Sequence, residues 1–150
     1  MIDVGVNLTG DFTSALDALE TKVKGQVLVS GTAAMAKVIY ERAKANAPIS
    51  ERTHFFIGRN KTKYGPYTPG SLQRAIYRTY VKERSSDNRA VYVVRWRTQK
   101  PPAGVPYGFM VEYGTSRIPP NPFLRKALSE MGEAIKAGQA RMSEVLKDGS

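Results

Sequence analysis

Side chains that most often perform catalysis or bind metals are scarce in this sequence of 150 residues, which contains one histidine and no cysteine. His54 would have to supply any histidine-dependent chemistry alone. General acid–base catalysis needs a partner within hydrogen-bonding distance of the imidazole, and the sequence around His54 suggests none. We therefore interpret His54 as a solvent-exposed loop residue. The lack of cysteine excludes a disulfide framework and thiolate metal sites.

The acidic residues of the central region do not suggest a catalytic centre either. Glu41, Glu51, Glu83 and Asp87 lie among basic residues at no spacing typical of metal ligands, whereas a Mg²⁺-dependent nuclease needs clustered carboxylates. Residues 114–116, Gly-Thr-Ser, lack the second glycine and the lysine of a phosphate-binding loop, so we interpret them as a turn. The sequence predicts no catalytic, cofactor-binding or metal-binding residue, and no enzyme.

Basic residues are the most prominent chemical feature of the chain. Its net charge is +10, and residues 37–100 carry +11, against −2 for residues 1–36 and +1 for residues 101–150. A positive region of this size favours polyanions such as DNA, RNA or acidic protein surfaces.

Helical periodicity precedes the basic region. Apolar residues recur every three or four positions between Asp11 and Ala47, in two stripes. The stripes are Phe12, Leu16, Leu19, Val23 and Val27, followed by Leu28, Met35, Ile39 and Ala43. Gly25 and Gly31 each weaken a helix by about 1 kcal/mol relative to alanine, so we expect one long helix with a weak middle, or two helices. Pro48 should end this segment, and part of so long a stripe should contact another subunit.

Two strands are expected within the basic region. Residues 72–84 and 89–98 read as an antiparallel hairpin joined by a polar turn. If Arg84 pairs with Arg89, one face of the hairpin collects basic side chains, which we predict to face DNA. These are Arg78, Lys82, Arg95 and Arg97. Like charges placed opposite one another destabilise a hairpin unless an anion or acidic partner faces them, so the alternative is a solvated strand surface. A shift of one residue in register would exchange the two faces.

Residues 49–71 read as a long exposed loop rich in glycine, proline and bases. Four of its bases, Arg52, Arg59, Lys61 and Lys63, are interleaved with aromatic residues. Such a mixture suits single-stranded nucleic acid, or a subunit interface whose aromatic side chains pack on a neighbour. We favour the interface, with Phe55, Phe56, Tyr64 and Tyr67 as its candidate residues. Residues 99–106, which contain three prolines, should form a stiff arm.

Residues 107–125 combine an apolar segment, a glycine and a helix start. The segment 107–113 fits either a strand or a helical turn, and Gly114 should end it. Asn121 reads as an N-cap and Pro122 as the first residue of a helix that continues to Lys147.

The same stretch holds one acidic side chain between apolar neighbours and two candidate core residues. Glu112 lies between Val111 and Tyr113, so it should be partly buried and paired with Arg125 or Arg117, within the chain or across a subunit interface. Phe123 and Leu124 should be core residues.

This stretch resembles the pattern of the putative tail-component family of long-tailed double-stranded DNA phages, the tail-completion or head–tail joining proteins. The matching residues are Tyr107, Val111, Glu112, Gly114, Thr115, Ser116, Pro122, Phe123, Leu124 and Arg125, while Gly108 replaces the usual alanine. A looser match upstream consists of Ala43, Lys44, Ala47, Pro48, Gly70 and Leu72. About twenty residues separate Pro48 from Gly70 where the family has only a few, so the loop 49–71 is an insertion relative to the pattern.

The resemblance implies a structural protein of the virion, at the neck or tail top, that completes the tail and joins it to the head. It implies a ring of this chain, by analogy with tail symmetry a hexamer, in contact with neighbouring tail and head-connector proteins and assembled in the host bacterial cytoplasm. Basic side chains that line the ring would contact the phosphates of DNA passing through it. The alternative is a free-standing basic nucleic-acid-binding protein.

The elements together predict an α+β fold: a long N-terminal helix, a small antiparallel sheet, and a C-terminal helix packed on the sheet. The length suits one domain spanning residues 1–150. No stretch reaches the roughly 20 apolar residues of a membrane span, and Asp3 and Asp11 precede the first lysine, which does not fit a secretory signal.

Overall fold

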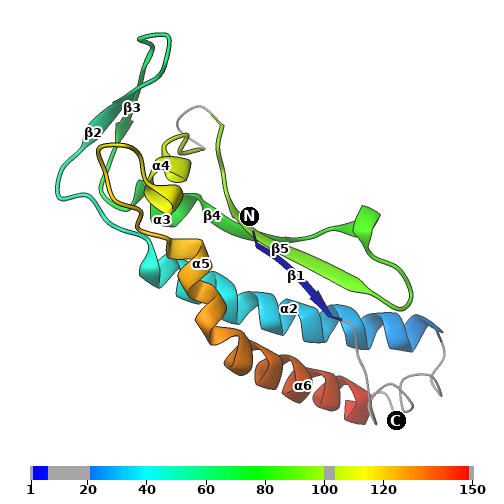
Figure 1. The fold of residues 1–150 in the computed structure, drawn as a ribbon. Helices are drawn as coiled ribbons and strands as arrows, with labels where there is room; N and C mark the ends of the chain where they lie inside the picture. The colour runs from blue at the N-terminus through cyan, green and yellow to red at the C-terminus, as the bar shows by residue number, and fades with distance from the viewer. Residues whose placement is uncertain (1, 7–20, 100–103, 149–150) are drawn as a thin grey trace. The chain divides into compact units, whose positions relative to one another are not determined.

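A computed structural model describes residues 2–6, 21–99 and 104–148 (Figure 1). They combine helices with two small antiparallel sheets, which confirms the α+β class. The elements are β1 (Ile2–Val6), α2 (Thr21–Asn46), β2 (His54–Ile57), β3 (Lys63–Tyr67), α3 (Ser71–Ala75), β4 (Ile76–Tyr80), β5 (Ala90–Trp96), α4 (Gly108–Tyr113), α5 (Phe123–Ala127) and α6 (Met131–Asp148). Short 3-10 helices occupy Lys82–Arg84 and Leu128–Glu130.

The chain forms two compact units whose segments alternate along the sequence. Unit 1 comprises the described parts of Met1–Ile39, Arg78–Val94 and Glu130–Ser150. Unit 2 comprises those of Tyr40–Tyr77 and Arg95–Ser129. The expectation of a single domain stays a prediction.

Unit 1 contains α6, part of α2, strand β1 and most of β4 and β5. These strands form the three-stranded sheet, whose strand order is β1-β5-β4. Strand β1 runs antiparallel to β5, with Ile2 opposite Val94 and Val6 opposite Ala90. A buried cluster of Val27, Leu28, Ala90 and Met142 joins α2, β5 and α6.

Two glycines let α2 and α6 approach closely within unit 1. A Cβ atom on Gly31 would lie 2.3 Å from Cγ of Met142, and one on Gly138 would lie 2.5 Å from Cγ of Met35. Each glycine therefore makes room for a methionine of the facing helix. Gly25 and Gly31 do not divide the helix, since α2 is continuous from Thr21 to Asn46. The predicted residues 11–20 lie outside the described part of the chain.

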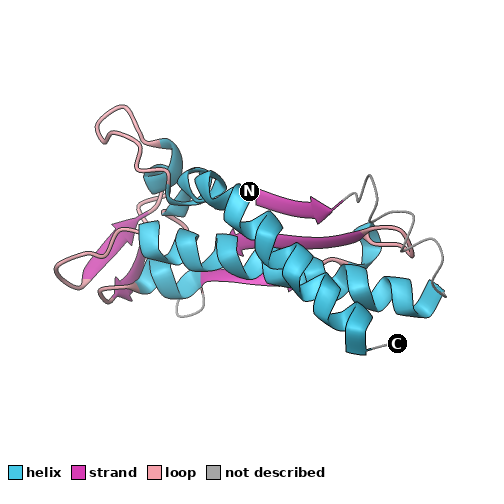
Figure 2. Cartoon of the chain, turned by 90° about the horizontal axis from the view of Figure 1, so that it is seen from below, coloured by secondary structure: helices cyan, strands magenta, loops and turns pink. Residues whose placement is uncertain are grey.

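Unit 2 contains the second sheet, and Figure 2 distinguishes its strands from the helices. Strands β2 and β3 pair antiparallel, with His54 opposite Tyr67 and Ile57 opposite Lys63. The prediction of a long exposed loop over residues 49–71 is therefore wrong in its central part, because residues 54–57 and 63–67 pair as strands there. The arm 99–106 lies partly outside the described residues, and Val105 donates its N–H to Arg97 O at 2.6 Å.

The predicted strand 72–84 is also shorter than expected. Residues 71–75 form the helix α3, and the 3-10 helix follows β4. Main-chain hydrogen bonds from Val81 N to Val91 O (2.8 Å) and from Arg97 N to Ala75 O (3.0 Å) fix the pairing of β4 with β5. This register differs from the predicted one by one residue, so Val94 rather than Arg95 lies opposite Arg78.

The helix expected over residues 122–147 is interrupted. It divides into α5 and α6, with the 3-10 turn Leu128–Glu130 between them. Residues 107–113 fit either a strand or a helical turn by sequence alone. In the structure, residues 108–113 of this segment form the helix α4.

Candidate functional site

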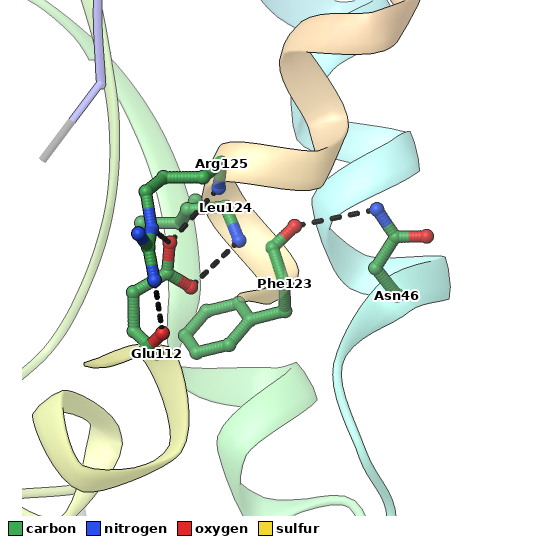
Figure 3. A network of polar contacts seen from close by, with 5 residues as sticks. All are labelled: Asn46, Glu112, Phe123, Leu124 and Arg125. Carbon is green, nitrogen blue, oxygen red and sulfur yellow. Dashed lines mark hydrogen bonds and ion pairs between the residues drawn. The ribbon is translucent and has the colours of Figure 1, made fainter. Parts of the chain in front are cut away.

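Residues 107–125 fold into two short helices of unit 2 that Glu112 ties together. Glu112 is only 1% exposed and comes from α4. Its Oε2 accepts a hydrogen bond from Leu124 N at 3.0 Å, and its Oε1 accepts one from Arg125 N at 2.9 Å (Figure 3). The buried carboxylate thus accepts hydrogen bonds from two main-chain N–H groups that have no partner within the helix, because they lie at its start.

Arg125 completes this arrangement, which we call the Glu112 clamp: Glu112, Leu124 and Arg125. Nε of Arg125 donates to Oε1 of Glu112 at 3.2 Å, and Nη2 donates to the Glu112 main-chain O at 2.6 Å. The guanidinium carbon lies 4.8 Å from the centre of the Tyr113 ring. The predicted pairing of Glu112 with Arg125 is confirmed within the chain, whereas Arg117 lies in an exposed turn outside the clamp.

The expected capping of α5 by Asn121 is wrong. Pro122 occupies the N-cap position and no local side chain caps the helix. Asn121 instead donates its main-chain N–H to Val111 O at 2.7 Å. The side chain that accepts hydrogen bonds from the start of α5 is therefore Glu112, which belongs to the preceding helix α4. The partial positive charge at the N-terminal end of α5 stabilises its carboxylate.

Phe123 and Asn46 link the clamp to the end of α2. Phe123 is fully buried, as predicted, and Leu124 is 1% exposed. The main-chain O of Phe123 accepts a hydrogen bond from Nδ2 of Asn46 at 3.3 Å (Figure 3). Hydrogen bonds thus connect three parts of unit 2, which are helix α4, helix α5 and the last turn of α2.

The Trp96 ring accounts for the glycine at position 108. A Cβ atom on Gly108 would lie 2.2 Å from Nε1 of Trp96. The Trp96 ring also contacts Phe109 and Phe123, with centroid distances of 5.0 and 5.5 Å. The indole fills the space that an alanine side chain would need.

The turn after α4 has the structure expected of residues 114–116. Gly114 has φ 75°, which favours glycine, and Thr115 N donates to Ile118 O at 2.8 Å. Oγ1 of Thr115 accepts hydrogen bonds from the main-chain N–H groups of Arg117 and Ile118.

The α4 helix turns an apolar face to solvent. Gly108 and Glu112 are buried, whereas Phe109 and Tyr113, each one position further along, are 53% and 51% exposed. Their rings stack with centroids 6.3 Å apart. Met110 on the same helix and Ile118 in the turn are 41% and 57% exposed. We call Phe109, Met110, Tyr113 and Ile118 the α4 face.

A small cavity of about 220 Å³ lies within unit 2, lined by residues that include His54, Leu72, Tyr107 and Val111. His54 is partly buried against the rings of Tyr67 and Tyr107, at centroid distances of 5.6 and 5.1 Å, so its interpretation as an exposed loop residue is wrong. Nδ1 of His54 and the Tyr67 hydroxyl are buried and have no partner among the described residues.

Two tyrosines beside this cavity hold their protons tightly. Burial is the largest cause that raises the pKa of Tyr107 to about 12; Tyr67 acts in the same direction and Arg74 in the opposite one. Burial also raises the pKa of Tyr67, with a smaller contribution from Tyr64. A phenolate is poorly solvated in these positions.

The predicted aromatic interface residues have different surroundings. Phe55 is 49% exposed on β2, while Phe56 and Tyr64 are partly buried and stack on each other with centroids 6.1 Å apart. Tyr67 is 3% exposed and packs inside unit 2, so its ring offers almost no surface to a partner.

The predicted DNA-facing basic residues do not share one face of the hairpin in the way expected, because the observed register places Val94 rather than Arg95 opposite Arg78. Nη1 of Arg78 donates to Ala33 O at 3.4 Å, Arg95 is half-buried, and the Arg97 guanidinium lies 4.9 Å from the Tyr77 ring centre.

Other site classes find no support in the part of the chain that the structure describes. No group of three or more histidine and acidic side chains there could hold a metal ion. None of the helices described is long and apolar enough to cross a membrane. No protein-family model, curated protein or solved structure matches the chain.

Proposed function

We propose that this chain is a structural protein of a phage particle, at the neck or tail top, where copies of it form a ring that completes the tail and joins it to the head. The observation that carries the proposal is the α4 face. It lies within the stretch 107–125 that resembles the tail-component pattern, and it exposes four apolar side chains close together in the sequence.

Exposed aromatic and aliphatic side chains grouped in this way favour a protein–protein contact. The Glu112 clamp supports such a role, because it fixes α4 from its buried side and leaves Phe109 and Tyr113 presented on a rigid support. A rigid support reduces the entropy lost on association. Repeated head-to-tail contact of one such face with a different surface of the next copy closes into a ring when the rotation between copies allows it.

The proposal is tested by sedimentation velocity of the wild-type chain, alone and with purified tail proteins. We expect a ring or a tail complex. The double variant Tyr113→Ser, Ile118→Ser should shift the distribution toward the single chain, because it removes two exposed apolar contacts. Ile135→Ser is the matched control, since Ile135 is 43% exposed on α6 and lies outside the α4 face.

Particles assembled without the protein provide the functional readout. We expect filled heads and tails that remain unjoined in electron micrographs. Intact, infectious particles would contradict the proposal, as would a chain that stays monomeric with every tail protein.

A second candidate is a free-standing nucleic-acid-binding protein. It is favoured by the central charge, since residues 52–82 contain no acidic residue. A chain that binds nucleic acid with nanomolar affinity at physiological salt and joins no particle would support this candidate over the first.

A further inference from the structure

The β2–β3 hairpin concentrates positive charge without compensation. Residues 52–82 contain seven basic residues and no acidic one. Arg59, Lys61 and Lys63 lie at or beside the tip of the hairpin and are exposed. Among the residues that the structure describes, no carboxylate pairs with Arg59, Lys61 or Lys63.

Hydrogen bonds hold this tip in a defined turn. Gly58 N donates to Thr62 O at 2.8 Å, and Lys61 N donates to Gly58 O at 2.9 Å. Lys61 has φ 60°, in the left-handed region. The three bases are therefore displayed on a short, ordered ribbon.

Phe55 is half-exposed on the same ribbon, and two groups lie against its ring. Nζ of Lys63 lies 4.0 Å from the ring centre. The position of a Cβ atom on Gly65 would be 3.0 Å from Cδ1 of Phe55, so the ring also lies against the Gly65 backbone. Lys63 thus occupies a ring face on which a nucleic-acid base could stack, and such stacking contributes to the affinity of single-strand binding.

We propose that the tip of the β2–β3 hairpin binds the phosphate backbone of duplex DNA, without reading its sequence, through Arg59, Lys61 and Lys63. Charge complementarity supports this partner, since a cluster of basic side chains without carboxylate partners matches the closely spaced phosphates of a duplex. A two-stranded ribbon also fits the major groove. The inference goes beyond the proposed function and does not depend on ring formation.

The rival explanation is that these bases only prevent the hairpin edges from pairing with other strands, as edge lysines do. An acidic protein surface is another possible partner. The salt slope of the affinity for DNA tests the first explanation, and a comparison with poly-glutamate tests the second.

The test is fluorescence anisotropy of the full chain with a labelled duplex of about 30 base pairs, from about 50 to about 200 mM NaCl. Three phosphate contacts predict a slope of log K against log salt of about −2.7, and a roughly fortyfold loss of affinity over this range. The variant Arg59→Gln, Lys61→Asn should lower the slope to about −1 and weaken binding at low salt by about tenfold or more. Asparagine is chosen at position 61 because it tolerates positive φ.

The control Lys126→Gln, Lys136→Gln removes the same charge from two exposed positions outside the hairpin and should keep the wild-type slope. Equal slopes for the hairpin variant and this control would overturn the proposal. Tighter binding to a single strand of the same length, or equal binding to poly-glutamate, would also overturn it. Thermal unfolding confirms that each variant is folded.

Discussion

At the scale of single residues, the Glu112 carboxylate carries several interactions at once. It accepts two main-chain N–H groups and the Arg125 side chain while almost fully buried. Glu112→Gln should lower the free energy of unfolding by about 2–3 kcal/mol, because it replaces charged acceptors and turns an amide N–H₂ toward main-chain donors.

Arg125→Ala should have a smaller effect, about 1–2 kcal/mol, because the two main-chain N–H groups still solvate the carboxylate and the Arg125 side chain is 50% exposed. The control Glu133→Gln, at an exposed position of α6, should change stability by less than about 0.5 kcal/mol. Urea unfolding measures all three, and an Arg125→Ala effect larger than that of Glu112→Gln would contradict the capping role.

Gly108 provides a second prediction at this scale. Alanine is the better helix former by about 1 kcal/mol, yet Gly108→Ala should destabilise the protein by about 1–2 kcal/mol, because its Cβ would overlap the Trp96 indole. Gly25→Ala is the control. No atom lies within 4 Å of a Cβ at position 25, so this change should stabilise the protein by up to about 1 kcal/mol. Thermal melts of the two variants should move in opposite directions.

The sequence predicts a partner for Glu112, either Arg125 or Arg117, because an acid between apolar neighbours needs one nearby, and the structure shows that the partner is Arg125. Sequence reasoning missed the cap on α5 because helix-start patterns are local, and the carboxylate that serves this helix lies in another element. It could not explain Gly108 either, since the reason is the shape of a tryptophan twelve residues earlier in the chain.

At the scale of elements, periodicity predicted the long helix and the C-terminal helix but not the β2–β3 hairpin. Gly58, Gly65 and Pro66 are typical of loops, and the two strands are short, with four residues in β2 and five in β3. The sequence pattern therefore did not indicate strands in this segment. The β4–β5 register was off by one for a different reason. Val93 and Val94 are both buried, so the alternation that would select a register is absent from β5.

The packing of Tyr107 beside the hairpin predicts a pH dependence. A pKa raised to about 12 in the folded protein, against about 10 when unfolded, means that the folded state holds this proton more tightly. The resulting stability is fully present below pH about 10 and is lost as the pH rises toward about 12.

Tyr107→Phe should therefore lose less stability than the wild type between these two pH values. The measurement is chemical denaturation at a series of alkaline pH values, with Tyr77→Phe as the control because Tyr77 lies outside the cavity. Identical pH profiles for the wild type and Tyr107→Phe would contradict the role of burial.

At the scale of the whole molecule, a net charge of +10 opposes the compact state through repulsion between like charges. Raising NaCl from about 20 to about 300 mM should screen this repulsion and raise the melting temperature by about 2–4 °C, the shift expected for about 1 kcal/mol in a chain of this size. The variant Arg59→Gln, Lys61→Asn should respond less. A melting temperature that falls with salt would show that favourable ion pairs outweigh the repulsion.

Composition and periodicity predicted the α+β class, but they could not show the two units. Each unit combines segments far apart in the sequence, and such an arrangement depends on packing between side chains that no local pattern records. The role in a phage particle stays a proposal for the same reason, because it concerns surfaces that meet only in an assembly.

The pairing of Ile2 with Val94 has a consequence for biosynthesis. The ribosome synthesises β1 before β5, so some ninety further residues must emerge before the partner strand of β1 is present. Asn46 likewise waits for the Phe123 carbonyl. The nascent chain therefore carries an unpaired strand until Val94 has emerged, and Asn46 has no partner at the end of α2 until Phe123 has emerged.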